Sequence, residues 1–296
     1  MKVLVTGATG FVGSNLTRRL IEAGHEVHIT MRPSSSFLPI ADIWDRVHSV
    51  TYDGTIGSLT GYLKGQPPFD GVFHTAARAG YDDGPVDEYI ESNIRFGTHL
   101  LAAMDRTGST TLVNTGTAWT HGQNRDYDPV CLYAATKAAF SRIIDYYVLA
   151  KGFSCVTLEL YDVYGEYDTR PKLVHLLKRA ADTETPLDTT PGEQPIALSH
   201  IEDVVSGYIR AWELLMETPP AHRRYVLDAD EVTTVRELIA RMEAIWGVPV
   251  PVDLGARSYR EREVMALWDQ GERLPGWRPR IGLSEGLGRL KENARP

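Results

Sequence analysis

Hydrophobic and polar positions follow one another along the first half of the chain in a repeating order, with short apolar runs separated by longer segments of helical period. Short apolar runs bounded by turn residues predict buried strands, and the longer periodic segments predict amphipathic helices. Strands are expected at Val3–Val5, Val27–Thr30, Val47–Tyr52, Gly71–His74, Thr111–Asn114 and Cys155–Leu160. Helices are expected at about Phe11–Ala23, Val86–Arg106 and Cys131–Lys151. This alternation predicts an α/β fold built on a doubly wound parallel sheet with right-handed crossovers.

The pattern changes after about Leu160, where loops rich in proline, glycine and aspartate separate shorter amphipathic segments. Helices are expected near residues 172–181, 201–215, 234–246, 258–268 and 284–292. Tyr225–Leu227 has the pattern of a strand that rejoins the main sheet. We therefore expect one doubly wound domain over residues 1–160 and a smaller lobe mainly over residues 161–296, with segments near 196–227 returning to the first domain.

The loop after the first predicted strand carries Gly7, Gly10 and Gly13, and a predicted helix follows directly. A turn with this spacing lets the backbone approach a pyrophosphate and aims the free N–H groups of the helix at it. Its place between a strand and a helix is the context that the motif requires. The residues therefore predict that the first domain binds a dinucleotide. The other loop residues expected at the cofactor are Thr9, Phe11 and Val12.

Composition excludes several classes of protein. The 296 residues are 43% hydrophobic and 24% charged, as in ordinary globular proteins. A net charge of −8 predicts no nucleic-acid partner, and no apolar run approaches the roughly 20 residues of a membrane span. Two cysteines, Cys131 and Cys155, are too few for a disulfide framework, and the histidines lack metal-ligand spacing. Because Met1-Lys2 leads directly into a strand, with no signal peptide, we expect a cytoplasmic protein without a metal.

Tyr133 and Lys137 stand four residues apart at the start of a predicted long helix and therefore share one helix face. An ammonium near a phenol favours the phenolate and lowers the pKa of the tyrosine. Such a tyrosine can give or take a proton at a carbonyl or alcohol oxygen. The alternative is an ordinary tyrosine beside a solvated lysine. The glycine motif and the hydroxyl-rich strand end that precede this helix favour the catalytic interpretation.

Threonines follow the strand expected at Thr111–Asn114, at the edge where ligands bind in an open α/β sheet. Thr115 and Thr117 are both expected to point their hydroxyls there. Thr117 is our choice for the fixed dipole that holds the reacting oxygen. The alternative is that both residues only fill strand positions. Trp119 and His121 come next and are expected to line a sugar site.

These segments together resemble the extended short-chain dehydrogenase/reductase family, whose members include nucleotide-sugar epimerases, dehydratases and 4-keto reductases. The resemblance covers nearly the whole chain and includes the glycine motif and a catalytic triad of Thr117, Tyr133 and Lys137. It extends to His200-Ile-Glu-Asp203 and Pro275-Gly-Trp-Arg-Pro279 in the C-terminal half. It implies a homodimer formed through the two longest predicted helices. Further positions that it places at the cofactor are Asp53, Gly54, His74, Ala76, Ala77, Asn93, Thr115, Tyr161 and Val163.

Within that family the chain looks most similar to enzymes of the CDP-abequose and CDP-paratose synthase type, which reduce a nucleotide-bound 4-keto-3,6-dideoxyhexose with NADPH. The similarity rests on the Asn114-Thr-Gly-Thr117 run, the stretch from Pro129 to Tyr133, and Thr190-Pro-Gly-Glu193. It implies an NADP-dependent oxidoreductase that acts on the C4 ketone of a nucleotide-linked keto-deoxyhexose. Tyr133 would move the proton of the reacting oxygen, while Lys137 would lower the pKa of Tyr133 and hold the nicotinamide ribose.

The chain departs from the family pattern at several places. Ala118-Trp119 stand where the family's 4,6-dehydratases carry Asp-Glu, so dehydration is discounted. Glu159 stands where many relatives have arginine, and Asp162 where they have asparagine. Either carboxylate is expected to hydrogen-bond sugar hydroxyls, although for Glu159 a local ion pair is an equal alternative.

The residues after the second predicted strand bear on the choice of cofactor. NAD-preferring proteins carry an acidic residue there, whereas this chain has Met31, followed by Arg32 and Ser34. Without a carboxylate a 2′-phosphate is not repelled, and Arg32 offers it a planar, charged set of donors while Ser34 adds a neutral one. We therefore expect NADP(H). The alternative is a surface arginine in a flexible loop.

The remaining candidates concern the substrate. Trp119 and Asp162 are expected to contact it, and Arg257, one of an arginine cluster with Arg260 and Arg262, is expected to hold its diphosphate. A solvated helix face is the equal alternative for that cluster. Cys131 fits a small residue at a helix start better than a base, since no nearby cation makes it a thiolate.

Other functions stay open at this point. A sugar-nucleotide 4-epimerase uses the same triad, returns the hydride to a transient ketone and usually keeps NAD tightly bound. A reductase of a small carbonyl compound needs no nucleotide handle. A non-catalytic NADP-binding protein typically loses the tyrosine or the lysine, and this chain retains both.

Overall fold

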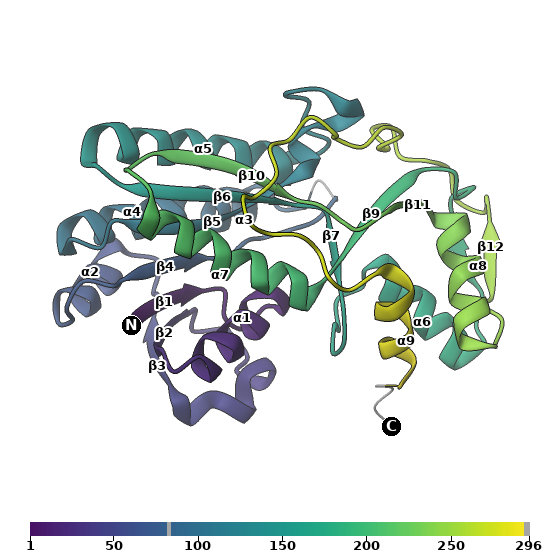
Figure 1. Cartoon of the computed structure of the whole chain (residues 1–296), viewed down its shortest axis with the longest axis horizontal. Coiled ribbons are helices and arrows are strands. Elements are labelled where there is room, and N and C mark those ends of the chain that lie inside the picture. The colour runs from purple at the N-terminus through teal and green to yellow at the C-terminus, as the bar shows by residue number, and fades with distance from the viewer. Residues whose placement is uncertain (82–83, 293–296) are drawn as a thin grey trace.

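The computed structural model describes residues 1–81 and 84–292 and has an α/β architecture (Figure 1). Its centre is a seven-stranded sheet in the order β10-β6-β5-β4-β1-β2-β3. The strands are β1 (Lys2–Thr6), β2 (Glu26–Met31), β3 (Val47–Thr51), β4 (Gly71–His74), β5 (Thr111–Thr117), β6 (Ser154–Leu160) and β10 (His222–Leu227). All neighbouring strands in this sheet are parallel, which confirms the doubly wound fold class.

Helices cover both faces of this sheet (Figure 1). α1 (Phe11–Glu22) and α7 (Ile201–Glu217) pack together on one face, and α2 (Ile56–Lys64), α4 (Phe96–Thr107) and α5 (Leu132–Lys151) pack on the other. Each face buries its own apolar cluster, with Leu16 and Tyr208 fully buried in one and Leu100 and Phe140 in the other. Burial of apolar surface on both faces stabilises the strands and so fixes the carboxyl edge of the sheet.

The strand order reverses between β1 and β4, because β1 pairs with β2 on one side and with β4 on the other. In an open α/β sheet, loops that leave neighbouring strands at such a reversal diverge and open a crevice for a ligand. The glycine turn follows β1 at this point, and residues 75–81 follow β4. The topology therefore places the predicted dinucleotide site at the switch point.

A smaller lobe with its own apolar core lies beyond the carboxyl edge of the sheet (Figure 1). It contains α6 (Leu173–Thr183), α8 (Val235–Trp246) and α9 (Leu283–Glu292). Its short strands are β7 (Asp162–Tyr164), β8 (Leu187–Thr189), β9 (Pro195–His200), β11 (Val232–Thr234) and β12 (Val252–Leu254). They form a sheet of order β11-β9-β7 and a β12-β8 pair.

Two predicted helices differ from those observed. The expected helix Val86–Arg106 is divided into α3 (Val86–Tyr89), a π-helical turn, η2 (Ile90–Arg95), and α4. The helix expected at 258–268 is absent, and residues 255–282 form an extended segment, here called the strap, that crosses from β12 back to α9. Its own hydrogen bonds are limited to isolated turns, such as Glu263 N–H to Arg260 O, while Gln123 and Asn124 of a distant loop bond to its backbone and side chains, so tertiary contacts override the local helical pattern.

Short 3₁₀ segments complete the described chain, at η1 (Leu38–Arg46), η3 (Ala118–Thr120) and η4 (Gly122–Asn124). Among residues 1–81 and 84–292, no helix combines the length and the apolar character that a membrane crossing requires.

Candidate active site

The glycine turn packs tightly against the loop after β4. Gly7 has a φ of 71°, and a Cβ on it would lie 2.6 Å from the Ala76 nitrogen. A Cβ on Gly13 would lie 2.1 Å from the Gly7 oxygen, so neither position can carry a side chain. Gly10 is the N-cap of α1, and no side chain caps the helix there. The first-turn amides of α1 are therefore open to an anion, as a pyrophosphate requires.

Residues expected at the adenosine end lie on exposed loops after β2 and β3. The Arg32 side chain is exposed, and its backbone N–H donates to Ser35 Oγ at 3.1 Å. Ser34 is exposed beside it. The Asp53 carboxylate accepts bonds from the Thr55 N–H at 2.9 Å and the Thr55 hydroxyl at 2.7 Å, which lower its pKa. Gly54, with a φ of 94°, makes the turn between them.

His74 ends β4 in a fully buried position. Its Nδ1 lies 2.8 Å from Thr6 Oγ1, whereas its Nε2 has no hydrogen-bond partner within the described part of the chain. Burial, assisted by the nearby charge of Lys137, holds the pKa of His74 well below its ordinary value. A neutral imidazole in this position joins β1 to β4 beside the glycine turn. The partly exposed Ala76 and the exposed Ala77 follow it.

Asn93 connects the loop after β4 to the helix that carries Tyr133. The Asn93 side chain accepts from Arg78 N at 2.8 Å and donates to Arg78 O at 3.0 Å. It also donates to Thr136 Oγ1 at 2.9 Å, and Thr136 donates to the Tyr133 carbonyl at 2.8 Å. Because Asn93 is on the π-helical turn, the predicted uninterrupted helix did not reveal this connection.

Thr117, Tyr133 and Lys137 come together where β5 and α5 meet. Thr117 is 5% exposed, and its side chain is hydrogen-bonded to the half-buried Tyr133. Lys137 is 3% exposed, and its Nζ has no hydrogen-bond partner among residues 1–81 and 84–292. An ammonium with no protein partner is an available donor for hydroxyl or phenolate oxygens. The Thr115 hydroxyl is instead hydrogen-bonded within the protein, to His74 O at 2.8 Å and to Tyr208 Oη at 2.5 Å.

The lowering of the Tyr133 pKa that the sequence predicts is not found. Burial, together with the charge of Cys131, raises that pKa above its ordinary value, and the bond with Thr117 offsets this only in part. Burial also lowers the pKa of Lys137, from 10.5 to about 8. Cys131 itself has a raised pKa because of burial, so its thiol is not a base at neutral pH.

A cleft of about 810 Å³ lies between the sheet edge and the smaller lobe. Predicted residues that line it are Trp119, Tyr161, Asp162, Val163 and Arg257. The Trp119 ring meets the Tyr133 ring edge to face at 6.0 Å, so the triad lies directly beneath one wall of the cleft.

Aromatic and cationic side chains stack over this wall, and two of them, Tyr81 and Lys172, were not singled out from the sequence. The Tyr81 ring lies 3.7 Å from the Trp119 ring, and the Arg260 guanidinium lies 3.8 Å from the Tyr81 ring. Lys172 Nζ lies 4.9 Å from the Trp119 ring. Nothing in the local sequence around Tyr81 signals this contact, because Trp119 lies on η3 and Arg260 on the strap.

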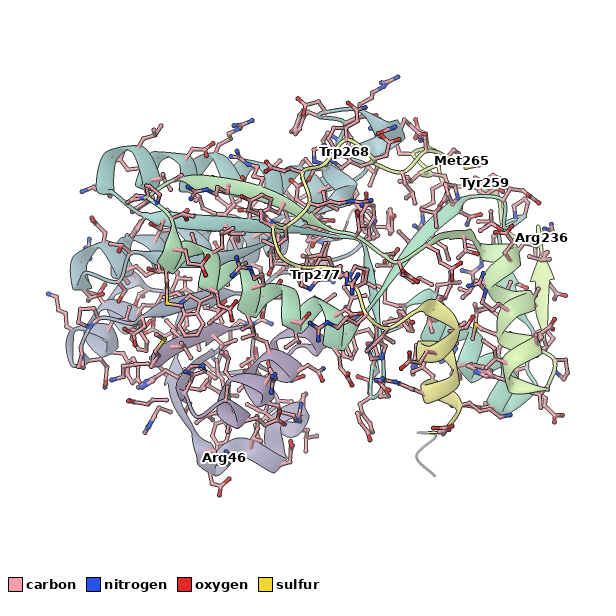
Figure 2. The ribbon with its side chains drawn as sticks, in the orientation of Figure 1. Arg46, Arg236, Tyr259, Met265, Trp268 and Trp277 are labelled. Atoms are coloured by element: carbon pink, nitrogen blue, oxygen red, sulfur yellow. The ribbon has the colours of Figure 1, made fainter. Side chains whose placement is uncertain are left out.

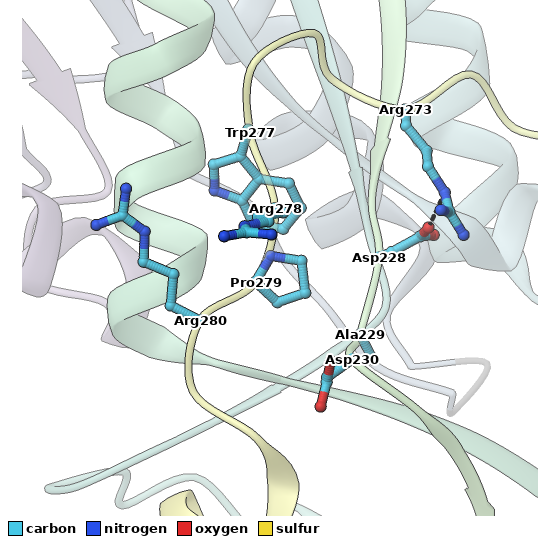
Figure 3. A pocket seen from close by; sticks show the side chains of 8 residues that line it. All are labelled: Asp228, Ala229, Asp230, Arg273, Trp277, Arg278, Pro279 and Arg280. Carbon is cyan, nitrogen blue, oxygen red and sulfur yellow. Dashed lines mark ion pairs between the residues drawn. The ribbon is translucent and has the colours of Figure 1, made fainter.

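The strap connects the cleft to the body of the protein. Figure 2 shows Tyr259, Met265, Trp268 and Trp277 spaced along it. Trp277 Nε1 donates to Ser206 Oγ at 2.8 Å and to Asp203 O at 3.2 Å, and thereby attaches the strap to α7. A second cavity, of about 520 Å³, lies beside this contact, where Arg273 pairs with Asp228 at 2.5 Å (Figure 3). This cavity does not share a lining residue with the cleft.

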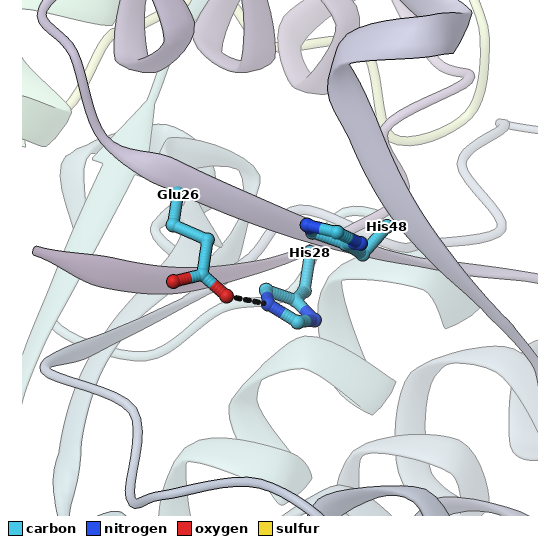
Figure 4. Close-up of side chains that lie close together, drawn as sticks. All are labelled: Glu26, His28 and His48. Carbon is cyan, nitrogen blue, oxygen red and sulfur yellow. Dashed lines mark hydrogen bonds and ion pairs between the residues drawn. The ribbon is translucent and has the colours of Figure 1, made fainter.

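One group of potential metal ligands lies on neighbouring strands β2 and β3 (Figure 4). Glu26 Oε1 is 2.9 Å from His28 Nε2 and 3.2 Å from Lys2 Nζ. His28 Nδ1 is 2.7 Å from the Tyr62 hydroxyl, and the His48 ring stacks on His28. These contacts account for the packing of the group without an ion.

The doubly wound sheet, the uncapped glycine turn and the Tyr–Lys helix define a dinucleotide-binding enzyme fold. Residues 3–226 match the model of the NAD dependent epimerase/dehydratase family, and the chain belongs to that family. This confirms the resemblance to extended short-chain dehydrogenases/reductases.

Relatives and solved structures agree with this assignment. The UDP-glucose 4-epimerase of Corynebacterium glutamicum is 25% identical over 305 positions, with 94% of this chain and 91% of that protein covered. The CDP-abequose synthase of Yersinia pseudotuberculosis is 27% identical, with 90% and 91% covered. The structure of the Thermotoga maritima UDP-glucose 4-epimerase with UDP-glucose superposes with a TM-score of 0.86 at 20% identity, covering 99% of this chain and 98% of that one. A Bacillus cereus UDP-glucuronic acid 4-epimerase in complex with NAD gives 0.85 at 21% identity, with the same coverage.

Proposed function

We propose that this chain is an oxidoreductase that reduces the C4 ketone of a nucleotide-linked 4-keto-(di)deoxyhexose with NADPH. The observation that carries the proposal is the unpaired, buried Lys137 Nζ beside the hydrogen-bonded Thr117–Tyr133 pair. A buried ammonium without a partner is costly, so its retention indicates that it acts on a ligand.

Each member of this triad has a distinct task in the proposal. Thr117 holds the reacting oxygen by a hydrogen bond, and Tyr133 gives that oxygen its proton in the direction of reduction. Lys137 stabilises the resulting phenolate and donates to the nicotinamide ribose hydroxyls. The cofactor, when bound, supplies the hydride. Asn93 holds the helix that carries Tyr133 and Lys137 through its bond to Thr136.

The residues that would hold the cofactor lie along the switch-point crevice. The α1 amides and the glycine turn fit a pyrophosphate, and the steric limits on Gly7 and Gly13 support that fit. Arg32 and Ser34 are proposed to hold a 2′-phosphate, since both side chains are exposed, Arg32 forms no ion pair within the described chain, and no carboxylate ends β2. Other proposed contacts are Thr9, Phe11, Val12, Asp53, Gly54, His74, Ala76, Ala77, Thr115, Tyr161 and Val163.

The cleft suits an anionic sugar nucleotide. Lys172, Arg257 and Arg260 line it, and no ion pair to any of these three is recorded among the described residues. We propose that Arg257 binds the diphosphate and that Trp119 and Asp162 contact the sugar. In this assignment residues 1–160 form the cofactor domain and 161–296 mainly the substrate lobe, with segments near 196–227 completing the first domain.

The test measures the consumption of NADPH, through the loss of its near-ultraviolet absorbance, with a panel of nucleotide-linked 4-keto-6-deoxy sugars. We expect consumption that requires the sugar nucleotide and is lost in Tyr133→Phe. Cofactor binding without consumption across the panel would overturn the ketoreductase assignment.

A sugar-nucleotide 4-epimerase is the second candidate, because UDP-glucose 4-epimerases are relatives over nearly the whole chain. An epimerase converts its substrate with no net use of added cofactor. Interconversion of a UDP-hexose and its C4 epimer by the protein would therefore favour this alternative.

We also propose a homodimer formed through the helices at 86–106 and 131–151. Tyr146 and Leu149 on α5 are 57% and 86% exposed, and Val86 on α3 is 55% exposed. Large apolar side chains exposed on the surface of helices are typical of a contact surface.

A further inference from the structure

His121 and Glu159 form a buried pair at the end of the cleft beside Thr117. Glu159 on β6 stands opposite Gly116 in the register of β5 and β6, directly beside the catalytic strand end. Its Oε2 lies 3.2 Å from His121 Nε2. His121 is 9% exposed and lines the cleft. The local ion pair, one of the two expectations for Glu159, is therefore present.

The geometry favours the protonated form of His121. Its Nδ1 lies 3.2 Å from the Arg125 carbonyl oxygen, and its Nε2 faces the Glu159 carboxylate. Both partners only accept hydrogen bonds, and a neutral imidazole has only one N–H to donate. Both bonds therefore require the imidazolium form. His200 provides a contrast, because its Nδ1 accepts from the Glu202 N–H and leaves a single donor facing Glu166.

The charged environment of His121 supports the same state. Burial lowers the pKa of His121, but the hydrogen bond and charge of Glu159, together with backbone hydrogen bonds to Asp126 and Arg125, outweigh it and raise the pKa above its ordinary value. Charged groups from three elements face or adjoin the ring. Glu159 comes from β6, and Arg125, Asp126 and Asp128 come from the loop of His121 itself. The strap contributes Asp269 and Arg262, and Arg262 is paired with Asp128.

The His121 ring lies flat on Trp268 of the strap, with ring centres 4.2 Å apart and planes at 13°. A cation stacked on an indole is attracted by the electron-rich face of that ring. Trp268 O also accepts a bond from the Tyr161 hydroxyl on the cleft wall. Deprotonation of His121 would remove the cation–π part of its attraction to Trp268 and one of the two hydrogen bonds of the ring.

The loop that contains His121 binds the strap at further points. Gln123 Nε2 donates to Glu263 O at 2.6 Å, and Met265 N donates to Gln123 Oε1 at 3.3 Å. Asn124 Nδ2 donates to Asp269 Oδ1 at 2.8 Å, and Asp269 N donates to Asn124 Oδ1 at 3.2 Å. The strap between these points also lines the cleft, through residues that include Arg260, Val264 and Leu267.

We propose that His121 is a positioning residue: as an imidazolium held by Glu159, it keeps Trp268, and with it the strap, closed against the substrate end of the cleft. The strap supplies one wall of the site, so its position sets substrate affinity rather than the chemical step. This role deepens the proposed function, and only its predicted effect on substrate affinity rests on that function. The structural consequence, a strap that loosens as His121 loses its proton, holds for the protein alone.

The test follows hydrogen exchange of the amides at 262–270 in the ligand-free protein as a function of pH, after correction for intrinsic exchange. The variants are His121→Gln, Glu159→Gln and, as a matched control, His48→Gln, an exposed histidine on β3. We expect protection of the strap to fall about five-fold as pH rises through the His121 titration, the fold-change of a cation–π contact at a partly exposed site. Glu159→Gln should move this loss to lower pH, His121→Gln should show low protection at every pH, and His48→Gln should match wild type.

The kinetic arm measures kcat and KM over the same range of pH with whichever substrate turns over. We expect KM to rise by a similar factor while kcat changes little. Strap exchange that is independent of pH in the wild type, or unchanged by Glu159→Gln, would overturn the proposal. Absence of turnover in every protein would contradict the proposed function instead, and the exchange result would still decide the role of His121.

Discussion

The Asn93 amide donates a 2.9 Å hydrogen bond to the Thr136 hydroxyl, and Thr136 lies between Tyr133 and Lys137 on α5. The same amide bonds both backbone groups of Arg78, in the loop after β4. One fully buried side chain therefore fixes α5 relative to the loop after β4. The π-helical turn at Ile90–Arg95 places this side chain between them.

Replacing Asn93 tests this connection. Asn93→Ala leaves the Arg78 backbone groups without their side-chain partner, and an unsatisfied buried polar group costs about 1–3 kcal/mol. We expect urea unfolding to show a loss of that size, together with a lower kcat. Glu91→Ala, on the same turn but exposed, removes only a surface ion pair with Arg95 and should cost less than about 1 kcal/mol. Equal losses for the two variants would show that Asn93 has no special role.

We predict that the buried ammonium of Lys137 lowers the free energy of unfolding. Its pKa falls from 10.5 to about 8, so between these values the unfolded chain binds more protons and stability rises with pH. The full cost, about 3 kcal/mol, is present below the lower value. Lys137→Met should therefore be more stable than the wild type at neutral pH and should lose the rise in stability between pH 8 and 10.5. Unfolding of both ligand-free proteins across this pH range measures the difference in stability between them.

The same substitution should remove activity. Without the ammonium, the Tyr133 phenolate has no cation beside it, and general acid catalysis of about 10²–10⁴-fold would be lost. A Lys137→Met protein that is both less stable and fully active would contradict both parts of the account.

Arg32 is predicted to select the cofactor. Arg32→Glu introduces a carboxylate that repels a 2′-phosphate, and should raise KM for NADPH at least ten-fold more than KM for NADH, about 1.4 kcal/mol of discrimination. Arg46→Glu makes the same change of charge at the exposed end of η1 and is the control (Figure 2). Equal effects of Arg32→Glu on both cofactors would refute the assignment of NADP.

The proposed dimer is tested at Leu149. Leu149→Arg places a charge on an 86% exposed apolar position of α5, where it would be desolvated in a helix-to-helix interface. We expect light scattering after gel filtration to give twice the 33.0 kDa chain mass for the wild type and the chain mass for the variant. A wild-type monomer would exclude the dimer.

The main sheet could be predicted well from the sequence. Each buried parallel strand appears as a short apolar run, which can be recognised from the local sequence alone. The glycine turn and the Tyr133–Lys137 pair were likewise visible, since their spacing is short and physically constrained. Strands of three residues such as β7 and β8 were missed, because so short a segment carries no period.

The cleft was harder to predict for a related reason. Tyr81, Trp119 and Arg260 meet only in the folded chain, and no local pattern relates them. Residues 258–268 of the strap were predicted to be helical because they have helical spacing, but their hydrogen bonds to Gln123 and the nearby bond to Asn124 join segments far apart in the sequence. Burial, which controls the Tyr133 pKa, also depends on residues distant in sequence.

Isotope transfer tests the central claim most directly. The protein would be supplied with NADPH carrying deuterium on the transferred face of nicotinamide C4 and with a nucleotide-linked 4-keto-6-deoxy sugar, and the sugar product would be analysed by mass spectrometry and NMR. A ketoreductase places deuterium on sugar C4, and Tyr133→Phe should abolish the transfer. Product that forms without deuterium from the added cofactor would contradict ketoreduction by NADPH and support epimerisation by a retained cofactor.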